Sequence, residues 1–398
     1  MDEDRGAAID EFKYIIGSIL SLGDPLSISS LSNLLAKPVT NIRQELELLE
    51  AVFVVPPQNS IPVKAFHKSF KDFVLGRSCK EFQINQTETH RGLANRCIEL
   101  LSATLTKDIC QLKAPGINPE DLSPQKIESC LPLDVQYACR FWVYHAKESG
   151  LKVKDNDEVH SFLQTHLLFW FEALSLSGRL LESGKAIQDL QSIIDTTEGA
   201  KVKLFLRDTE RFLLSFRFII SKAPLQLYNS ALVFAPKGSL LRQKFSTLSD
   251  FSSWIDNPPS VESDWSPCLR SLEGHTNVVR GVAFLDNHRF ASACHSTIRI
   301  WNLVTGVCLQ TIEIDHTDKG GPISVAFSSK GKVATSSSGE IKIWDLDYGE
   351  CLQTAENAEG VWSMRFLEND NLVASIDSEK NRYMEHGGEE VATDAVAI

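Results

Sequence analysis

The chain has 398 residues, a formal net charge of −12 and a hydrophobic content of 43%, which is typical of a soluble chain with more than one compact domain. The acidic balance argues against general binding to nucleic acid, because phosphate groups are bound by clustered Lys and Arg. The nine cysteines show no CxxC spacing, so we expect no metal site and reduced, mostly buried thiols.

Nothing in the sequence points to a membrane. The acidic N-terminus lacks the apolar core of a signal peptide. The most apolar stretches, 167–176 and 212–220, each contain a charged residue and are much shorter than the roughly 20 residues that a membrane span requires. We therefore expect a cytoplasmic chain without a membrane partner.

Short elements follow one another in the first segment, 9–77. Apolar residues at helical spacing predict three short helices, and Asn41 with Gln44 resembles a capping box that opens the third. The next residues predict a strand at 52–55, a turn, a returning strand at 62–66 and a helix from His67. Three helices plus a hairpin are the layout of a winged-helix domain.

Residues 85–228 show helical periodicity and predict an array of packed helices without a fixed repeat length. The clearest helix covers 159–174, and we expect Asp155 or Asn156 to cap its start and Gly178 its end. The Ser/Pro-rich segment 229–268 then indicates a linker that is docked on both neighbours.

A repeat dominates the last segment, 269–398. Residues 282–284 (VAF) recur at 325–327, and 308–311 (CLQT) recur at 351–354, each time 43 positions later. A period of about 40–45 residues, with Gly-His near the start and Trp-Asp near the end, is the signature of WD-repeat propeller blades. We expect two full all-β blades, part of a third, and a polar tail.

The characteristic residues of a WD repeat each have a structural role, in which the His hydrogen-bonds within the blade, the Trp packs between blades and Gly permits turns. An Asp usually precedes the third strand, but 294–296 (CHS) and 337–339 (SSG) lack it. Propellers contain about four to eight blades, so we expect further blades from another chain, or truncation of a longer ancestor. The blade residues that we predict are Gly274, His275, Trp301, His316, Trp344 and Asp345.

Beyond the repeat, residues from about 9 to 270 resemble the region after the NTPase core of fungal NACHT/WD-repeat proteins, the incompatibility-type members of the STAND class. Motifs in matching order and approximate spacing carry this resemblance. They are 25–27 (PLS), 65–73 (AFHKSFKDF), 109–112 (ICQL), 131–132 (LP), 137–142 (YACRFW), 166–176 (HLLFWFEALSL), 224–228 (PLQLY) and 272–275 (LEGH).

The resemblance implies a regulatory and sensor-side module that binds protein partners through its blades. A NACHT NTPase core would be supplied in trans or on a longer chain. The resemblance also implies that His67, in the motif His-x-Ser-Phe-x-Asp/Glu-Phe, senses the nucleotide bound by that core. A His at a helix N-terminus lies among free backbone N–H groups that favour anions.

The chain itself is expected to be no enzyme and to need no cofactor. It contains no GxxxxGK[ST] motif, and Ser183-Gly184-Lys185-Ala186 lacks the hydroxyl that would bind magnesium. We interpret His160 and His166 as packing or hydrogen-bonded residues rather than catalysts.

Two alternatives stay open. In the first, the chain would be a free-standing WD-repeat scaffold unrelated to nucleotide signalling. In the second, its winged helix would bind DNA. The second is disfavoured because the helix that would enter the groove carries Arg43 among three Glu.

Overall fold

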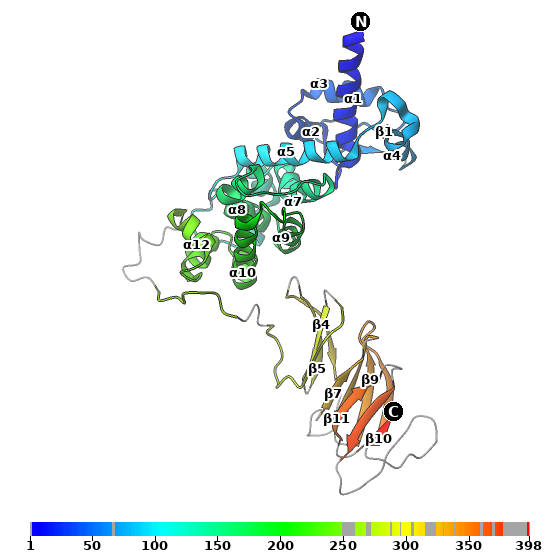
Figure 1. The fold of residues 1–398 in the computed structure, drawn as a ribbon, viewed down its shortest axis with the longest axis vertical. Coiled ribbons are helices and arrows are strands. Elements are labelled where there is room, and N and C mark those ends of the chain that lie inside the picture. Colours follow the sequence, from blue (N-terminus) through cyan, green and yellow to red (C-terminus); the bar gives the residue numbers. More distant parts are fainter. Residues whose placement is uncertain are drawn as a thin grey trace. The chain divides into compact units, whose positions relative to one another are not determined.

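A computed structural model of the chain forms two compact units, Met1–Leu269 and Arg270–Ile398. We call them the helical unit and the sheet unit and describe each by itself (Figure 1). The structure describes residues 2–65, 68–248, 259–267, 272–286, 289–294, 296–303, 306–314, 324–328, 330–337, 339–358, 361–367, 371–376 and 396–397.

The helical unit begins with α1 (Asp2–Ser21), α2 (Ile28–Leu35) and α3 (Val39–Glu47). The Ser27 side chain accepts a hydrogen bond from the Ser30 amide and caps the N-terminus of α2. The predicted capping box at Asn41 is wrong, because α3 already begins at Val39, after Pro38. The fixed φ of proline is compatible with that first turn.

The predicted hairpin is present as β1 (Phe53–Val54) and β2 (Lys64–Ala65), which pair antiparallel. Helix α4 (Lys68–Leu75) follows, and a short 3-10 helix, η1 (Arg77–Phe82), leads to the helical array. The Phe53 side chain is buried and meets the ring of Phe70 edge to face, so the hairpin packs on α4.

The helical array continues through residues 86–248, and α5, α7, α9 and α10 pack on one another in chain order (Figure 1). Helix α8 begins after Asp157, whose side chain accepts from the His160 amide. The predicted cap Asp155 instead accepts from the amides of Lys201 and Val202 at the start of α10. The elements are α5 (Gln86–Thr104), η2 (Pro119–Asp121), α6 (Pro124–Cys130), α7 (Leu133–Glu148), α8 (Glu158–Leu176), α9 (Glu182–Ser192), α10 (Ala200–Lys222), η3 (Leu227–Ala231), α11 (Leu232–Phe234), α12 (Leu240–Phe245) and η4 (Ser246–Leu248).

The segment predicted as a linker is therefore helical in its first part. A π-helix and two short α-helices occupy residues that the Ser/Pro content indicated as a linker. Leu241 and Phe245 are buried in the core of the helical unit. The Trp265 indole donates a 2.6 Å hydrogen bond to Asp208, which attaches the end of this segment to α10.

One hydrophobic core runs through the helical unit, from Ile15 in α1 to Phe245 in α12. At its centre the rings of Trp142 and Trp170 meet edge to face at 5.3 Å. A Cβ at Gly23 would lie 2.3 Å from the Phe141 ring, so only glycine permits this close approach of the α1–α2 connection to α7. The predicted winged-helix segment and the array thus share a core. Within the described residues, no helix is both long and apolar enough to cross a membrane.

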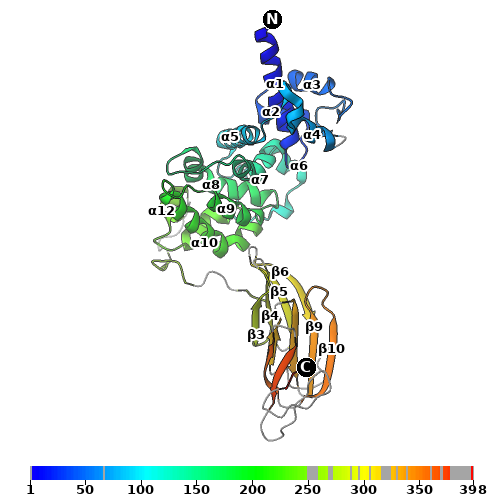
Figure 2. The ribbon, with the colours of Figure 1, turned by 45° about the vertical axis from the view of Figure 1, so that its right-hand side comes forward.

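The sheet unit contains three antiparallel sheets among its described strands (Figure 2). The first has the order β3-β4-β5-β6, the second β7-β8-β9-β10, and the third β11-β12-β13. The strands are β3 (Gly281–Phe284), β4 (Arg289–Ala293), β5 (Thr297–Asn302), β6 (Cys308–Glu313), β7 (Ser324–Phe327), β8 (Lys332–Ser337), β9 (Gly339–Asp345), β10 (Cys351–Ala358), β11 (Val361–Phe366), β12 (Leu372–Ile376) and β13 (Val396–Ala397).

Each pair of neighbouring sheets is joined by its own hydrophobic cluster. Ala291, Ala293 and Ile298 of the first sheet pack with Val333 and Trp344 of the second. A separate cluster, which includes Ala334, Ile341, Met364 and Leu372, joins the second and third sheets. Alternation of side chains along a strand makes this possible, because one face of the second sheet meets the first sheet and its other face meets the third.

Candidate functional site

The first sheet contains a closed hydrogen-bond network around His275. Its Nε2 lies 2.6 Å from the Ser292 hydroxyl, and its Nδ1 lies 3.2 Å from the Thr297 hydroxyl. The Trp301 indole donates to the same Ser292 oxygen at 2.7 Å. Burial and the neighbouring Arg299 lower the pKa of His275, so the neutral imidazole ties the segment before β3 to strands β4 and β5.

Gly274 allows this placement of His275. Its φ of 145° lies in the region that favours glycine, and an added Cβ would lie 2.5 Å from the Arg299 guanidinium. The guanidinium also lies over the Trp301 ring, 5.8 Å from its centroid. The Gly-His pair of the repeat is therefore required by backbone geometry as much as by hydrogen bonding.

Cys294 stands near the position of the missing Asp. The fully buried sulfur lies 3.2 Å from the Thr297 hydroxyl. Burial raises the pKa of the Cys294 thiol, but hydrogen bonds from Thr297 and from backbone amides outweigh this effect and the pKa is lowered. Thr297 and Cys294 thus supply the polar contacts on this side of the network.

In the second sheet, Trp344 and Asp345 have different roles. The Trp344 indole donates to the Thr335 hydroxyl at 3.0 Å, as Trp301 does to Ser292. The Asp345 carboxylate accepts from the amides of Asp347 and Tyr348 at 2.8 and 3.0 Å, so it caps the turn into β10. His316, the predicted counterpart of His275, lies outside the described residues.

The predicted nucleotide-sensing residue, His67, also lies outside the described residues, between β2 and α4. The Ser183–Ala186 segment, which has a partial likeness to a P-loop, lies inside α9. Its Ser183 side chain is buried and donates to the Leu180 carbonyl. Across the part of the chain that the structure describes, no group of His, Cys, Asp and Glu is suited to a metal ion.

The helical unit contains a buried polar chain that the sequence did not reveal. The Gly23 amide donates to the Tyr137 hydroxyl, which lies 2.8 Å from Nε2 of His145. Nδ1 of His145 lies 2.8 Å from Nδ1 of His90. One proton between the two rings satisfies both nitrogens. Burial, aided by His90, lowers the pKa of His145 to about 3, so this pair is neutral.

A second buried cluster centres on Glu172, the charged residue within the most apolar helix. Its carboxylate accepts from the amides of Asp108 and Ile109 and from the Tyr228 hydroxyl, at 3.1, 3.0 and 2.6 Å. Burial raises its pKa to about 7 despite these hydrogen bonds. The cluster fixes the loop after α5 against α8 and η3. The predicted roles of His160 and His166 as hydrogen-bonded residues agree with their contacts to Gln164 and Thr165.

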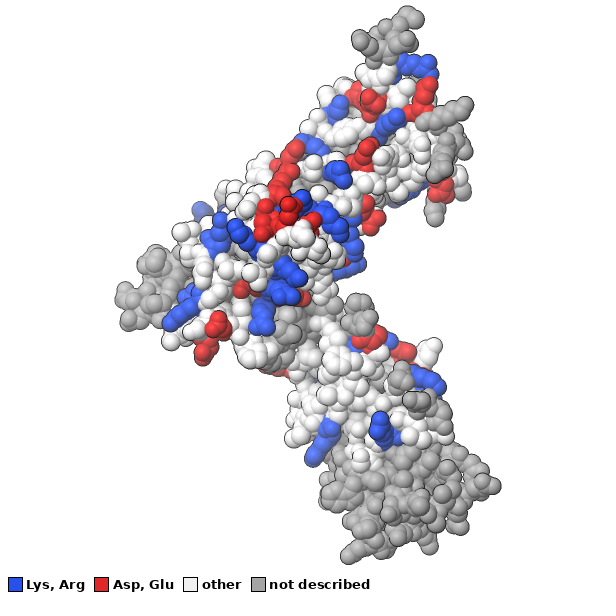
Figure 3. All heavy atoms as spheres, in the orientation of Figure 1, with Lys and Arg blue, Asp and Glu red and all other residues white. Residues whose placement is uncertain are grey.

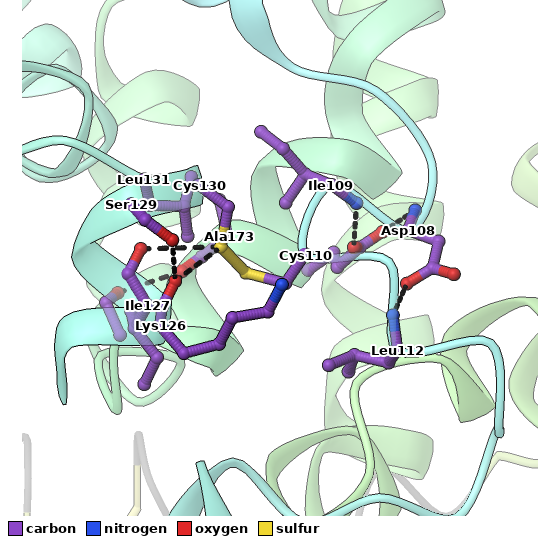
Figure 4. Close-up of a disulfide and its surroundings, with 12 residues drawn as sticks. Asp108, Ile109, Cys110, Leu112, Lys126, Ile127, Ser129, Cys130, Leu131 and Ala173 are labelled. Carbon is purple, nitrogen blue, oxygen red and sulfur yellow. Dashed lines mark hydrogen bonds between the residues drawn. A yellow bond between two sulfur atoms is a disulfide. The ribbon is translucent and has the colours of Figure 1, made fainter. Parts of the chain in front are cut away.

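The same loop contains a disulfide between Cys110 and Cys130, with a Cα–Cα distance of 5.3 Å (Figure 4). For these two residues, the expectation of reduced thiols is wrong. The pair joins the loop to α6, a helix without buried residues. Sequence spacing did not reveal the pair because 20 positions separate the two cysteines, and the fold alone brings them together.

Comparisons with known proteins identify the repeat in the sheet unit and several similar proteins. A family model for the WD domain, G-beta repeat, matches residues 266–302 and 306–345. Two proteins named mitochondrial division protein 1 match short stretches: the Vanderwaltozyma polyspora protein is 31% identical over 16% of this chain and 9% of its own length. The Mycosarcoma maydis protein is 39% identical over 14% of this chain and 7% of its own length. A β-propeller domain of Cps50 (Swd1) from Myceliophteria thermophila has 18% identity and a TM-score of 0.23, covering 26% of this chain and 33% of that one.

The network around His275 and the family match define a WD-repeat protein. A longer similarity specifies the relationship further. The chain is a homologue of the vegetative incompatibility protein HET-E-1 of Podospora anserina, with 34% identity over 74% of the chain. The chain spans 23% of the length of that relative. Because the sheet unit is less than half of the chain, the similarity must extend well into the helical unit.

Proposed function

We propose that the chain is the regulatory and sensor-side portion of a NACHT-type signalling protein that acts in the cytoplasm. Its WD-repeat sheets would bind a protein partner, and its helical unit would hold the off-state and transmit a change. It would perform no catalysis itself, since its 398 residues contain no P-loop sequence. A NACHT core would come from another chain or from a longer form of this one.

The similarity to HET-E-1 beyond the repeats is the observation that carries this proposal. WD repeats alone occur in proteins of many functions, because a fold does not specify a function. A match over 74% of the chain extends beyond the repeats into the helical unit. Figure 3 shows acidic and basic side chains interspersed over the helical unit, which suits a protein partner better than a polyanion.

Within this proposal, residues 9–77 are a winged helix and His67 contacts the nucleotide of the NACHT core. The order of α1, α2, α3, the β1–β2 hairpin and α4 supports the assignment. DNA binding is disfavoured further, since the Arg43 guanidinium donates to the carbonyls of Pro56 and Pro57 and to Asn59. The Arg43 guanidinium is therefore already hydrogen-bonded to the turn between β1 and β2.

A binding experiment tests the proposal. The full chain is titrated into a purified NACHT core of a fungal incompatibility-type protein, loaded with ADP or with a non-hydrolysable ATP analogue, and followed by calorimetry. We expect tighter binding to the ADP form and at least a tenfold loss for His67→Ala, the loss expected for about 1.4 kcal/mol. His166→Ala, in the array, is the matched control and should bind normally.

Failure to bind the core in either nucleotide state would contradict the proposal and favour a free-standing WD-repeat scaffold. If the ADP and ATP-analogue forms of the core bound equally, with no effect of His67→Ala, nucleotide sensing by His67 would be contradicted. That result would still agree with a role of the chain as an adaptor. We also expect no magnesium-dependent ATP hydrolysis by the chain alone; turnover that remains with the protein through further purification would contradict the assignment as a non-enzyme.

A further inference from the structure

Residues 113–130, between the loop after α5 and the start of α7, form a segment that we call the flap. It contains η2 and α6, and none of its residues is buried. Its apolar side chains Ile117 and Leu122 are only partly covered by the core of the helical unit. Its backbone hydrogen bonds include local ones, such as that from the Asp121 amide to the Asn118 carbonyl. Segments with so little buried surface open at low cost in free energy.

A disulfide and an ion pair link the flap to the rest of the helical unit. The Cys130 sulfur, at the end of the flap, is bonded to Cys110 in the loop after α5 (Figure 4). The Glu120 carboxylate of η2 lies 3.3 Å from the Lys222 ammonium, but both side chains are at least half exposed. An exposed ion pair contributes little stability because water screens the charges. The disulfide is therefore the stronger of these two attachments.

The loop on the other side of the disulfide is held firmly. The buried Glu172 carboxylate accepts from the amides of Asp108 and Ile109, and the Asp108 carboxylate accepts from the Leu112 amide. Asp108 and Gln111 have φ values of 54° and 52°. Residues with a side chain rarely adopt such values, which persist only where the surroundings impose them. The disulfide thus joins a firmly built loop to a weakly held flap.

The two cysteines differ in their access to solvent. Cys110 is 1% exposed, whereas Cys130 is half-buried and its neighbour Ser129 is exposed. Thiol–disulfide exchange begins when a thiolate attacks an accessible sulfur atom, so an external thiol reaches Cys130 rather than Cys110. In the cytoplasm, where the proposed function places the chain, a disulfide is usually transient and redox-active.

We propose that the Cys110–Cys130 disulfide is a redox site that controls the flap, and that its substrate is a dithiol reductant. One thiolate of the reductant attacks the Cys130 sulfur, forms a mixed disulfide and displaces Cys110. The second thiolate of the reductant then displaces Cys130, and the reductant leaves as a disulfide. Each displaced cysteine thiolate takes up one of the two protons that the reductant releases. Two electrons pass to the protein, and the flap loses its covalent attachment; exchange with the oxidised dithiol closes it again.

The geometry of the loop and the flap carries this inference, and the proposed function contributes only the reducing surroundings. A chain that binds no NACHT core can still open its flap, and a chain that binds one can keep its flap closed. The experiments on the flap use no NACHT core, so a failure of one proposal leaves the other untouched.

The first experiment measures whether the disulfide opens while the chain is folded. The full chain is equilibrated in mixtures of reduced and oxidised dithiothreitol and quenched in acid, and its free thiols are alkylated for peptide mass spectrometry. We expect Cys110 and Cys130 to convert reversibly between the linked and the alkylated form while circular dichroism remains that of the folded chain. The buried free cysteines Cys97 and Cys139 are internal controls and should be free thiols at every ratio.

The second experiment measures opening of the flap. The chain is reduced, the dithiol is removed under nitrogen, and trypsin is added at limiting concentration. Lys113 and Lys126 of the flap are exposed, and we expect cleavage after both to be about tenfold faster than in the oxidised chain, because cleavage follows the population of the open form. Lys203, exposed in α10, is the internal control and should stay uncut over the same period.

Three variants separate the disulfide from the other contacts. Cys130→Ser should be cut in the flap at the fast rate with or without prior reduction. Cys79→Ser is the matched control and should respond to reduction as the parent chain does. Lys222→Ala removes the ion pair but leaves the disulfide, so it should change the rate of cleavage in the oxidised flap by less than about twofold.

Several results would overturn the proposal. A purified chain in which the pair is never linked has no such redox site. A pair that resists the dithiol until the chain unfolds is a structural bond. Equal cleavage of the oxidised and reduced flap would show that apolar contacts hold it. Cleavage at Lys203 together with the flap would show that reduction loosens the whole helical unit.

Discussion

The two units of this chain bury their apolar side chains in different ways. The helical unit has one cluster that extends from α1 to α12, whereas the sheet unit has separate clusters, each confined to one pair of neighbouring sheets. In a repeat architecture, stability is a sum of local terms between neighbours. Damage should therefore spread through the helical unit and stay local in the sheet unit.

The largest expected effect is at Trp170, which is 1% exposed and donates to the Cys139 carbonyl. Trp170→Ala should lower the unfolding free energy of the helical unit by about 3–5 kcal/mol, because a large cavity is left in a continuous core. Urea unfolding followed by hydrogen exchange should show lost protection from α1 to α12 and unchanged sheets. Phe218→Ala is the control. A loss of protection that is limited to α8 and its neighbours would contradict the expectation that damage spreads through the helical unit.

The disulfide is expected to have the next largest effect. Cys130→Ser should lower the unfolding free energy of the helical unit by about 3 kcal/mol under non-reducing conditions, since an unfolded chain without the cross-link has more entropy. With a reducing agent present, the variant and the parent chain should have nearly equal stability. Cys79→Ser serves as control and should be neutral in both buffers. If Cys130→Ser were less stable than the parent chain by the same amount in both buffers, Cys110 and Cys130 would not form a disulfide.

Ser292→Ala tests whether damage in the sheet unit stays local. It leaves the Trp301 indole and the His275 ring without their shared partner, which should cost about 1–3 kcal/mol. The loss should be confined to the sheets that contact β4. Thr311→Ala, at an exposed position of β6, should change stability by less than about 0.5 kcal/mol. Lost exchange protection in the helical unit would contradict local behaviour.

At neutral pH the smallest expected effect is at His145, whose contribution to stability changes only as the pH is lowered. Its folded-state pKa of about 3 lies below the ordinary value of 6.5, so below pH 6.5 the unfolded chain takes up a proton that the folded chain does not. Stability should fall by up to about 1.4 kcal/mol per pH unit as the pH is lowered from about 6.5 towards 3. His145→Gln should have a flatter profile than the parent chain. Parallel profiles would show that His145 titrates normally.

Much of the fold was predictable because the relevant signals are local. Helical spacing located the long helix α8, and the motif at 282–284 with its copy at 325–327 located β3 and β7. The cap of α8 was assigned one or two residues too early, at Asn156 or Asp155, because several Asx residues in a row can each cap a helix. The helical part of 229–268 was missed, since Leu241 and Phe245 are helical through packing on the core.

The site was less predictable. Gly274, His275 and Trp301 were found because a repeat shows each residue type twice. The buried groups His90, His145 and Glu172 lack such a signal, since their partners come from distant helices. Glu172 alone stood out, as a charge inside an apolar run.

The direction of packing between the sheets has a consequence for synthesis. Domains fold as they emerge from the ribosome, N-terminal parts first. When β7 appears, the surface that accepts Val325 and Phe327 already exists in the first sheet, and the same holds for β11 on the second. Val282 and Phe284 emerge before any such surface has been made in the sheet unit. Val282 and Phe284, which are 59% and 75% exposed, therefore gain no such surface from the described sheets that are made after them.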